Sequence, residues 1–257
     1  MNAPEEHPGS GIDVSSGSRS ESSPSKAAAF YDMDGTLVRS NLLQSYLYLA
    51  RREPSLPESV WKTAIGIAKI PAFAWTDRRS RMRFNEMLFS GFKDCFVDNL
   101  LEIADEHFEE FLKPNLFPGA VDLVERGRKN GLRLVIVSGS LDFLVAPLAR
   151  WLEVDDIITN RLEVVDGMCT GRAQRPLVAG AAKARYLREY AEHHHVSLGD
   201  SFAFSDSYSD LPMLSVVGRP AAVHPDRKLR AAAAELRWPV LTLEDPRSRP
   251  PRNWWPW

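Results

Sequence analysis

AFYDMDGTLVRSN, residues 29–41, ends an apolar run with two aspartates, Asp32 and Asp34, followed at once by Gly35 and Thr36. A short apolar run of this kind is typical of a strand that is buried on both faces in a parallel sheet. Two carboxylates so close together repel each other unless a cation lies between them or water solvates both. The stretch therefore predicts a buried strand over residues 27–31 and a charged site at its carboxyl end.

Three further apolar runs suggest that this strand belongs to a sheet. They cover residues 132–140, 201–207 and 220–226, and helical patterns lie around them at 119–130, 141–152, 181–194 and 211–217. Strands that alternate with helices predict right-handed βαβ units, and so an α/β fold with a doubly wound, Rossmann-like parallel sheet. Asp166-Gly167, between two β-prone runs, interrupts the alternation and predicts a hairpin.

The segment 42–117 does not alternate in this way. Its helical patterns cover residues 42–51, 58–74, 78–89 and 96–112. We expect an all-helical cap inserted into a core domain that comprises residues 27–41 and 118–245. The apolar stretch 60–75 is too short and too charged to span a bilayer, because Lys62, Lys69 and Pro71 interrupt it. Burial inside the cap is the leading interpretation, and peripheral membrane contact is the alternative.

Both ends of the chain lie outside these predicted domains. Residues 1–26 are rich in Ser, Gly and Pro and contain no apolar core of a signal peptide, which predicts a disordered tail. Residues 246–257 form a second tail, rich in Pro and containing Trp254, Trp255 and Trp257. Tryptophan favours boundaries between apolar and wet surroundings, so this tail either docks on the domain or meets a partner or a membrane interface.

The overall composition is that of an ordinary globular protein. The 257 residues, 44% hydrophobic and 26% charged, suffice for one large domain or two modest ones. A net charge of −2 gives no field that would attract nucleic acid or an anionic membrane. Cys95 and Cys169 are not spaced for a metal and are too few for a disulfide framework. This fits a reducing compartment, so a cytoplasmic location is expected.

Polar residues follow the predicted strands, and they should meet at one edge of the sheet. Ligands of open α/β sheets bind outside the carboxyl ends of the strands. The residues expected there are Asp32, Asp34, Ser138, Gly139, Asp206 and Asp210, with Lys183 from the helix before the third strand. Carboxylates without cysteine or histidine favour a hard cation, and Mg²⁺ suits one or two carboxylates together with water and phosphate oxygens.

These residue types can divide the work of phosphoryl transfer. Asp32 can attack phosphorus as a nucleophile and form an aspartyl phosphate. Asp34 can protonate the leaving oxygen and later take a proton from the attacking water. Ser138, with nearby backbone N–H groups, can hold the phosphate oxygens while Lys183 offsets their charge. Gly35 permits the sharp turn by which the chain leaves the strand.

The motifs resemble those of the haloacid dehalogenase-like (HAD) phosphohydrolase superfamily over roughly residues 27–245. Residues 32–36, DMDGT, match its first motif, Ser138 its second, Lys183 its third, and Asp206 with Asp210 its fourth. The helical insert and the stretch SDSYSDLPML indicate subfamily IB, which includes phosphoserine phosphatase.

The resemblance implies a Mg²⁺-dependent phosphomonoesterase. The metal would be held by the side chains of Asp32 and Asp206 and by the backbone carbonyl of Asp34, while Asp210 would position a metal-bound water. It also implies a small phosphorylated substrate. The alternatives are transfer of the phosphoryl group to an acceptor alcohol and a non-enzymatic binder of phosphorylated ligands.

The substrate is less well specified than the reaction. The resemblance puts Asn41 where phosphoserine phosphatases carry a Glu for the substrate amine, and Asn85, with Arg83 close by, where they carry an Arg for its carboxylate. A desolvated amino-acid zwitterion needs charged partners. Histidinol phosphate or a lipid-linked phosphate are therefore alternatives to phosphoserine, and the oligomeric state is left open.

Overall fold

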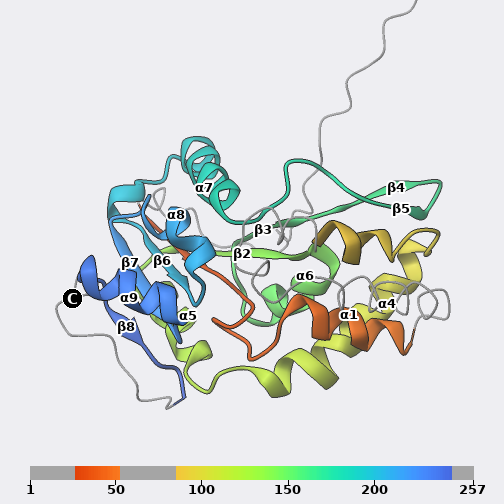
Figure 1. The fold of residues 1–257 in the computed structure, drawn as a ribbon, viewed down its shortest axis with the longest axis horizontal. Coiled ribbons are helices and arrows are strands. Elements are labelled where there is room, and N and C mark those ends of the chain that lie inside the picture. Colours follow the sequence, from red (N-terminus) through yellow and green to blue (C-terminus); the bar gives the residue numbers. More distant parts are fainter. Residues whose placement is uncertain (1–26, 53–84, 245–257) are drawn as a thin grey trace, which may run out of the picture.

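A six-stranded parallel sheet forms the centre of the described part of the chain, residues 27–52 and 85–244 of a computed structural model (Figure 1). Its strand order is β3-β2-β1-β6-β7-β8. The bounds are β1 Ala28–Tyr31, β2 Arg133–Leu141, β3 Asp156–Asn160, β6 Phe202–Ser205, β7 Arg219–Val223 and β8 Val240–Leu241. The chain moves outward from β1 to β3 and then returns to the other side of β1, so the strand order reverses at β1. The predicted doubly wound α/β fold is confirmed.

Helices cover both faces of the sheet, which is why the central strand β1 is buried and apolar along its whole length. Successive residues of β1 point to opposite faces: Tyr31 packs with the helices α5 and α6, and Phe30 packs with α7, α8 and α9. The bounds are α5 Ala120–Lys129, α6 Asp142–Trp151, α7 Ala181–His194, α8 Leu211–Leu214 and α9 Arg227–Glu235. This packing fixes the end of β1, and therefore the residues that follow it, at the middle of the sheet edge.

A helical layer and a hairpin lie at the end of the molecule opposite β7 and β8 (Figure 1). The helices are α1 Leu42–Ala50, a helix described over 85–90, and α4 Val97–His107, which continues as a π-helix over Phe108–Leu112 and a 3₁₀ turn over Lys113–Asn115. The hairpin pairs β4 Leu162–Val165 with β5 Met168–Ala173. Its turn is the predicted one, with positive φ at Asp166 (50°) and Gly167 (77°). These elements share an apolar cluster with α6.

Several boundaries differ from the prediction for local reasons. β3 and β8 were not predicted, because β3 is only partly buried over most of its length and β8 has two residues. The strand expected to reach residue 226 ends at Val223, since Asp226 caps α9 through the Leu229 N–H. α8 ends at Leu214 rather than 217, and the Gly218 N–H donates to the Leu198 carbonyl outside the helix.

Some predictions concern residues outside the described ranges. They are the helix over 58–74, most of the helix over 78–89, the apolar stretch 60–75 and both tails. The domain boundaries at 42 and 117 stay predictions for the same reason. Within residues 27–52 and 85–244, no helix is both long and apolar enough to cross a bilayer.

Candidate active site

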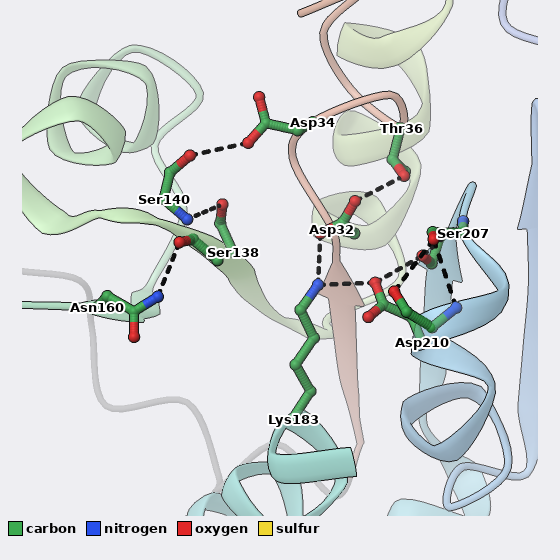
Figure 2. Close-up of polar contacts among 12 residues, drawn as sticks. Asp32, Asp34, Thr36, Ser138, Ser140, Asn160, Lys183, Ser207 and Asp210 are labelled. Atoms are coloured by element: carbon green, nitrogen blue, oxygen red, sulfur yellow. Dashed lines mark hydrogen bonds and ion pairs between the residues drawn. The ribbon is translucent and has the colours of Figure 1, made fainter. Parts of the chain in front are cut away.

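The two aspartates after β1 have different partners (Figure 2). Asp32 accepts from the Lys183 ammonium at 2.6 Å and from the Thr36 hydroxyl at 3.1 Å. Asp34 turns away from it and accepts from the hydroxyls of Ser140 at 2.8 Å and Ser40 at 3.3 Å. One carboxylate is thus paired with a positive charge, and the other is held by neutral donors.

Lys183 reaches the site from the first turn of α7 and is itself buried. Its ammonium donates to Asp32 at 2.6 Å and to Asp210 at 2.7 Å, and Asp210 also accepts from the Ser205 hydroxyl at 2.8 Å. Burial alone would lower the pKa of Lys183, but the carboxylates of Asp210 and Asp32 raise it above its usual value. The side chain is therefore a fixed positive charge between two acids.

We expect Lys183→Met to lower the free energy of unfolding by about 3–5 kcal/mol, because it leaves two buried carboxylates without their cation. Urea unfolding followed by circular dichroism measures this loss. Lys113→Met is a matched control: its pair with Glu109 is solvent-exposed on one helix face, and its loss should cost less than about 1 kcal/mol. Equal losses for the two variants would contradict the ion-pair assignment.

Asp206, after β6, lies directly over Gly35. A Cβ built on Gly35 would come within 2.3 Å of the Asp206 carboxylate, and Gly35 has a φ of +81°, so this position requires glycine on both grounds. Within the described residues, Asp206 has no ion pair. It is the carboxylate of the site most in need of a positive charge.

Burial raises the pKa of three carboxyl groups at this edge of the sheet. The pKa of Asp32 rises to about 6, against the effect of Lys183. The pKa of Asp34 rises to about 7, helped by the Asp32 charge. The pKa of Asp206 rises to about 8, helped by the charges of Asp32 and Asp210. With Asp210, four carboxyl groups thus surround the single ammonium of Lys183. The described site therefore contains fewer positive charges than acidic groups.

The donor set fits a hard divalent cation. Asp32 and Asp206 could provide oxygen ligands, and both line the same cavity. No group of three or more His, Cys, Asp or Glu side chains in residues 27–52 and 85–244 could hold a metal. A cation here would therefore need ligands besides side chains, such as a backbone carbonyl, a phosphate oxygen and water, as Mg²⁺ commonly has.

A cavity of about 550 Å³ opens at this edge and contains most of the predicted site residues. Asp32, Asp34, Gly139, Lys183, Asp206 and Asp210 all line it. Its wall also includes Asn41 and Asn85, beside the apolar Leu42, Leu43 and Val178. Arg83, the remaining candidate for substrate contact, lies outside the described residues.

Two of the predicted site residues also make structural contacts within the protein. The Asn41 side chain caps α1: its oxygen accepts from the Gln44 N–H at 3.1 Å, and the Gln44 side chain accepts from the Asn41 N–H at 3.1 Å. Ser138 is buried just behind the cavity, and its hydroxyl oxygen accepts from the Ser140 N–H at 3.0 Å. Gly139, between these two serines, lines the cavity itself.

Comparison with known families agrees with this geometry. The haloacid dehalogenase-like hydrolase family matches residues 29–215, a range that spans every residue of the site from Asp32 to Asp210. The chain belongs to the haloacid dehalogenase-like hydrolase family. The predicted family and enzyme class, a HAD-type phosphatase, are confirmed.

Curated relatives of this HAD-like hydrolase align over most of its length. An inhibition of morphological differentiation protein of Streptomyces azureus is 32% identical, covering 86% of this chain and 80% of the relative. A probable phosphatase of Mycobacterium tuberculosis is 31% identical, covering 86% and 77%. A phosphoserine phosphatase of the same organism is 27% identical, covering 83% and 70%.

Solved structures share the fold. A protein of unknown function from Bordetella pertussis superposes with a TM-score of 0.71 at 24% identity, covering 85% of this chain and 99% of the other. A phosphoserine phosphatase in its apo form gives a TM-score of 0.61 at 20% identity, covering 86% and 94%. At these identities the likeness supports the architecture of the HAD-like hydrolase and says nothing of its substrate.

The site of this HAD-like hydrolase also contains residues that the sequence analysis missed. The hydroxyls of Ser40 and Ser140 hold Asp34, and those of Thr36 and Ser205 hold Asp32 and Asp210. The sequence signal for Ser140 is its position two residues after Ser138, at the same strand end. Single hydroxyl residues near strand ends are so common that their partners become visible only in three dimensions.

Proposed function

We propose that this HAD-like hydrolase is a Mg²⁺-dependent phosphomonoesterase that transfers the phosphoryl group of a small phosphorylated metabolite first to Asp32 and then to water. The observation that carries the proposal is the separation of the two aspartates. Asp32 is paired with Lys183 at 2.6 Å, whereas Asp34 is held by hydroxyls and has its pKa raised to about 7. Two acids with such different surroundings suit the roles of nucleophile and proton carrier.

In the first step, a carboxylate oxygen of Asp32 forms a bond to phosphorus while the ester P–O bond breaks. Asp34, in its acid form, gives its proton to the leaving oxygen, and the alcohol departs. In the second step, Asp34 takes a proton from water as that water attacks phosphorus. The bond to Asp32 breaks, and inorganic phosphate leaves. Lys183 offsets negative charge through both steps.

The metal would be held by the side chains of Asp32 and Asp206 and by the backbone carbonyl of Asp34. When bound, it neutralises charge on the phosphoryl group during transfer. The deficit of positive charge among the four carboxyl groups supports this assignment. The contact between Asp210 and Lys183 at 2.7 Å adds a role in fixing the ammonium to the predicted role of Asp210 in positioning water.

The leaving group of the substrate would lie against the part of the wall formed by Asn41, Leu42, Leu43 and Asn85. This surface is neutral and partly apolar, and the Asn41 oxygen is already used in the helix cap. A small phosphomonoester fits a cavity of about 550 Å³. Cys95 and Cys169 are both buried and are not joined by a disulfide, which supports the proposed cytoplasmic location.

Chelation tests the metal requirement. We expect EDTA-treated protein to release no phosphate from an aryl phosphate, and excess Mg²⁺ to restore release, because the carboxylates of the site would otherwise repel the substrate. Malachite green detection of phosphate measures both. The same assay over phosphoserine, histidinol phosphate and phosphate esters of uncharged alcohols identifies the substrate class. Unchanged turnover in EDTA would contradict the metal assignment.

A further inference from the structure

The hydrogen-bond ladder between β2 and β3 is interrupted at the edge of the active site. Val137 pairs with Ile158, and Leu141 pairs with Asn160, but the register shifts between these two positions. Gly139 lies inside this interruption and lines the cavity. Its carbonyl group is therefore without a regular ladder partner and needs another donor.

The side chain of Asn160 supplies that donor. Its Nδ2 donates to the Gly139 carbonyl oxygen at 2.7 Å. Its Oδ1 accepts from the Val178 N–H at 2.8 Å. Only 2% of Asn160 is exposed, so both bonds are shielded from water. Since Gly139 and Val178 both line the cavity, one amide joins two segments of its wall.

We propose that Asn160 is a positioning residue of the phosphate site, which holds the Gly139 carbonyl away from the bound phosphoryl group. The inference rests on the proposed phosphatase function. A phosphate site must present donors, and a carbonyl oxygen facing a phosphate oxygen is repulsive. The peptide on either side of a glycine turns easily. The Asn160 amide fixes this carbonyl on the β3 side, so that it does not turn toward the bound phosphoryl group.

The amide chemistry of Asn160 is required because its two partners are of opposite kinds. A carbonyl needs a donor and an N–H needs an acceptor, and of the side chains of this size only a carboxamide offers both. Asn160→Asp keeps the shape and the acceptor for Val178 but replaces the donor by a carboxylate oxygen. Asn160→Ala removes both bonds without adding a charge. The two variants thus separate the Gly139 contact from general support of the wall.

The test measures the binding of inorganic phosphate by calorimetry and the steady-state constants with an aryl phosphate, both in Mg²⁺. We expect Asn160→Asp to weaken phosphate binding and to lower kcat/KM by roughly tenfold to a hundredfold, the range for a lost buried hydrogen bond that leaves an unpaired partner. In this variant KM should rise and kcat should fall. A purely structural role would reduce the fraction of folded enzyme and leave KM and phosphate affinity unchanged.

Ser201→Ala is the matched control for buried hydrogen bonding. Its hydroxyl accepts from the Ala28 N–H at 2.9 Å and donates to the Ser197 carbonyl at 2.6 Å, at the amino end of the strands and away from the cavity. We expect it to lower the unfolding temperature while phosphate affinity and KM stay at wild-type values. Where Asn160→Asp does not fold, Asn160→Ala is measured in its place.

Wild-type phosphate affinity and KM in either folded Asn160 variant would overturn the proposal. Failure of the proposed function has a different signature, because the wild-type protein itself would then release no phosphate from any ester. The wild type is assayed first, and phosphate binding by calorimetry is read separately from turnover.

Discussion

Asp32→Asn is expected to lower kcat for phosphate release by a factor of about 10⁴ or more, because an amide oxygen is too weak a nucleophile to replace the carboxylate. The substitution keeps the size of the side chain, and Lys183 keeps its contact with Asp210 at 2.7 Å. The fold should therefore survive. Release of phosphate from an aryl phosphate at saturating Mg²⁺ measures the loss, with circular dichroism to confirm folding.

Asp156→Asn is the control for Asp32→Asn. It makes the same carboxylate-to-amide change in an acid that pairs with Arg133 at 2.8 Å, at the amino end of β3 and away from the cavity. We expect its kcat to stay within a factor of about two of the wild type, since distant surface changes have small effects. If Asp32→Asn retained a similar rate, Asp32 would not be the nucleophile.

Asp34→Asn is expected to lower kcat/KM for an alkyl phosphate by a factor of about 10²–10⁴, the usual contribution of a general acid. The loss should be smaller for an aryl phosphate, whose leaving oxygen departs without much help from a proton. Parallel rate measurements on both esters provide the test. An equal loss of kcat/KM on the two esters would contradict the role of Asp34 as proton donor to the leaving oxygen.

The same variant should change the pH profile. Burial and the Asp32 charge raise the pKa of Asp34 to about 7, and only the protonated form can donate to the leaving oxygen. For the wild type, kcat/KM should therefore fall as pH rises through the neutral range, because the acid form is lost. Asp34→Asn has no proton to lose at this position, so its profile should lack that limb.

The sequence was informative where chemistry and regular structure coincide. The DMDGT stretch follows a strand that is buried on both faces, and the site requires carboxylates and a glycine at fixed positions after it. Asp32, Asp34 and Asp206 could therefore be predicted together, and α7 has the predicted bounds, Ala181–His194. The apolar strand pattern and the polar residues that follow it both predict a site at the same edge of the sheet.

The rest depends on contacts that no local pattern encodes. β3 is half-exposed, so its apolar run is weak, and Asn160 at its end could not be linked to Gly139 before the register shift was known. Asn41 matched a substrate position in the related sequences, whereas the structure shows it capping α1. Its capping box with Gln44 corresponds to the local pattern N-x-x-Q, which is typical of a helix start.

The most direct test of the central claim is mass spectrometry of protein quenched in acid during turnover. The proposed mechanism predicts that the peptide containing Asp32 gains the mass of one phosphoryl group in the wild type. It predicts more of this species in Asp34→Asn with an aryl phosphate, where loss of the base slows hydrolysis of the intermediate, and none in Asp32→Asn. Two results would contradict the covalent role of Asp32. One is turnover by the wild type and Asp34→Asn without any phosphorylated peptide, and the other is a phosphoryl group on another residue.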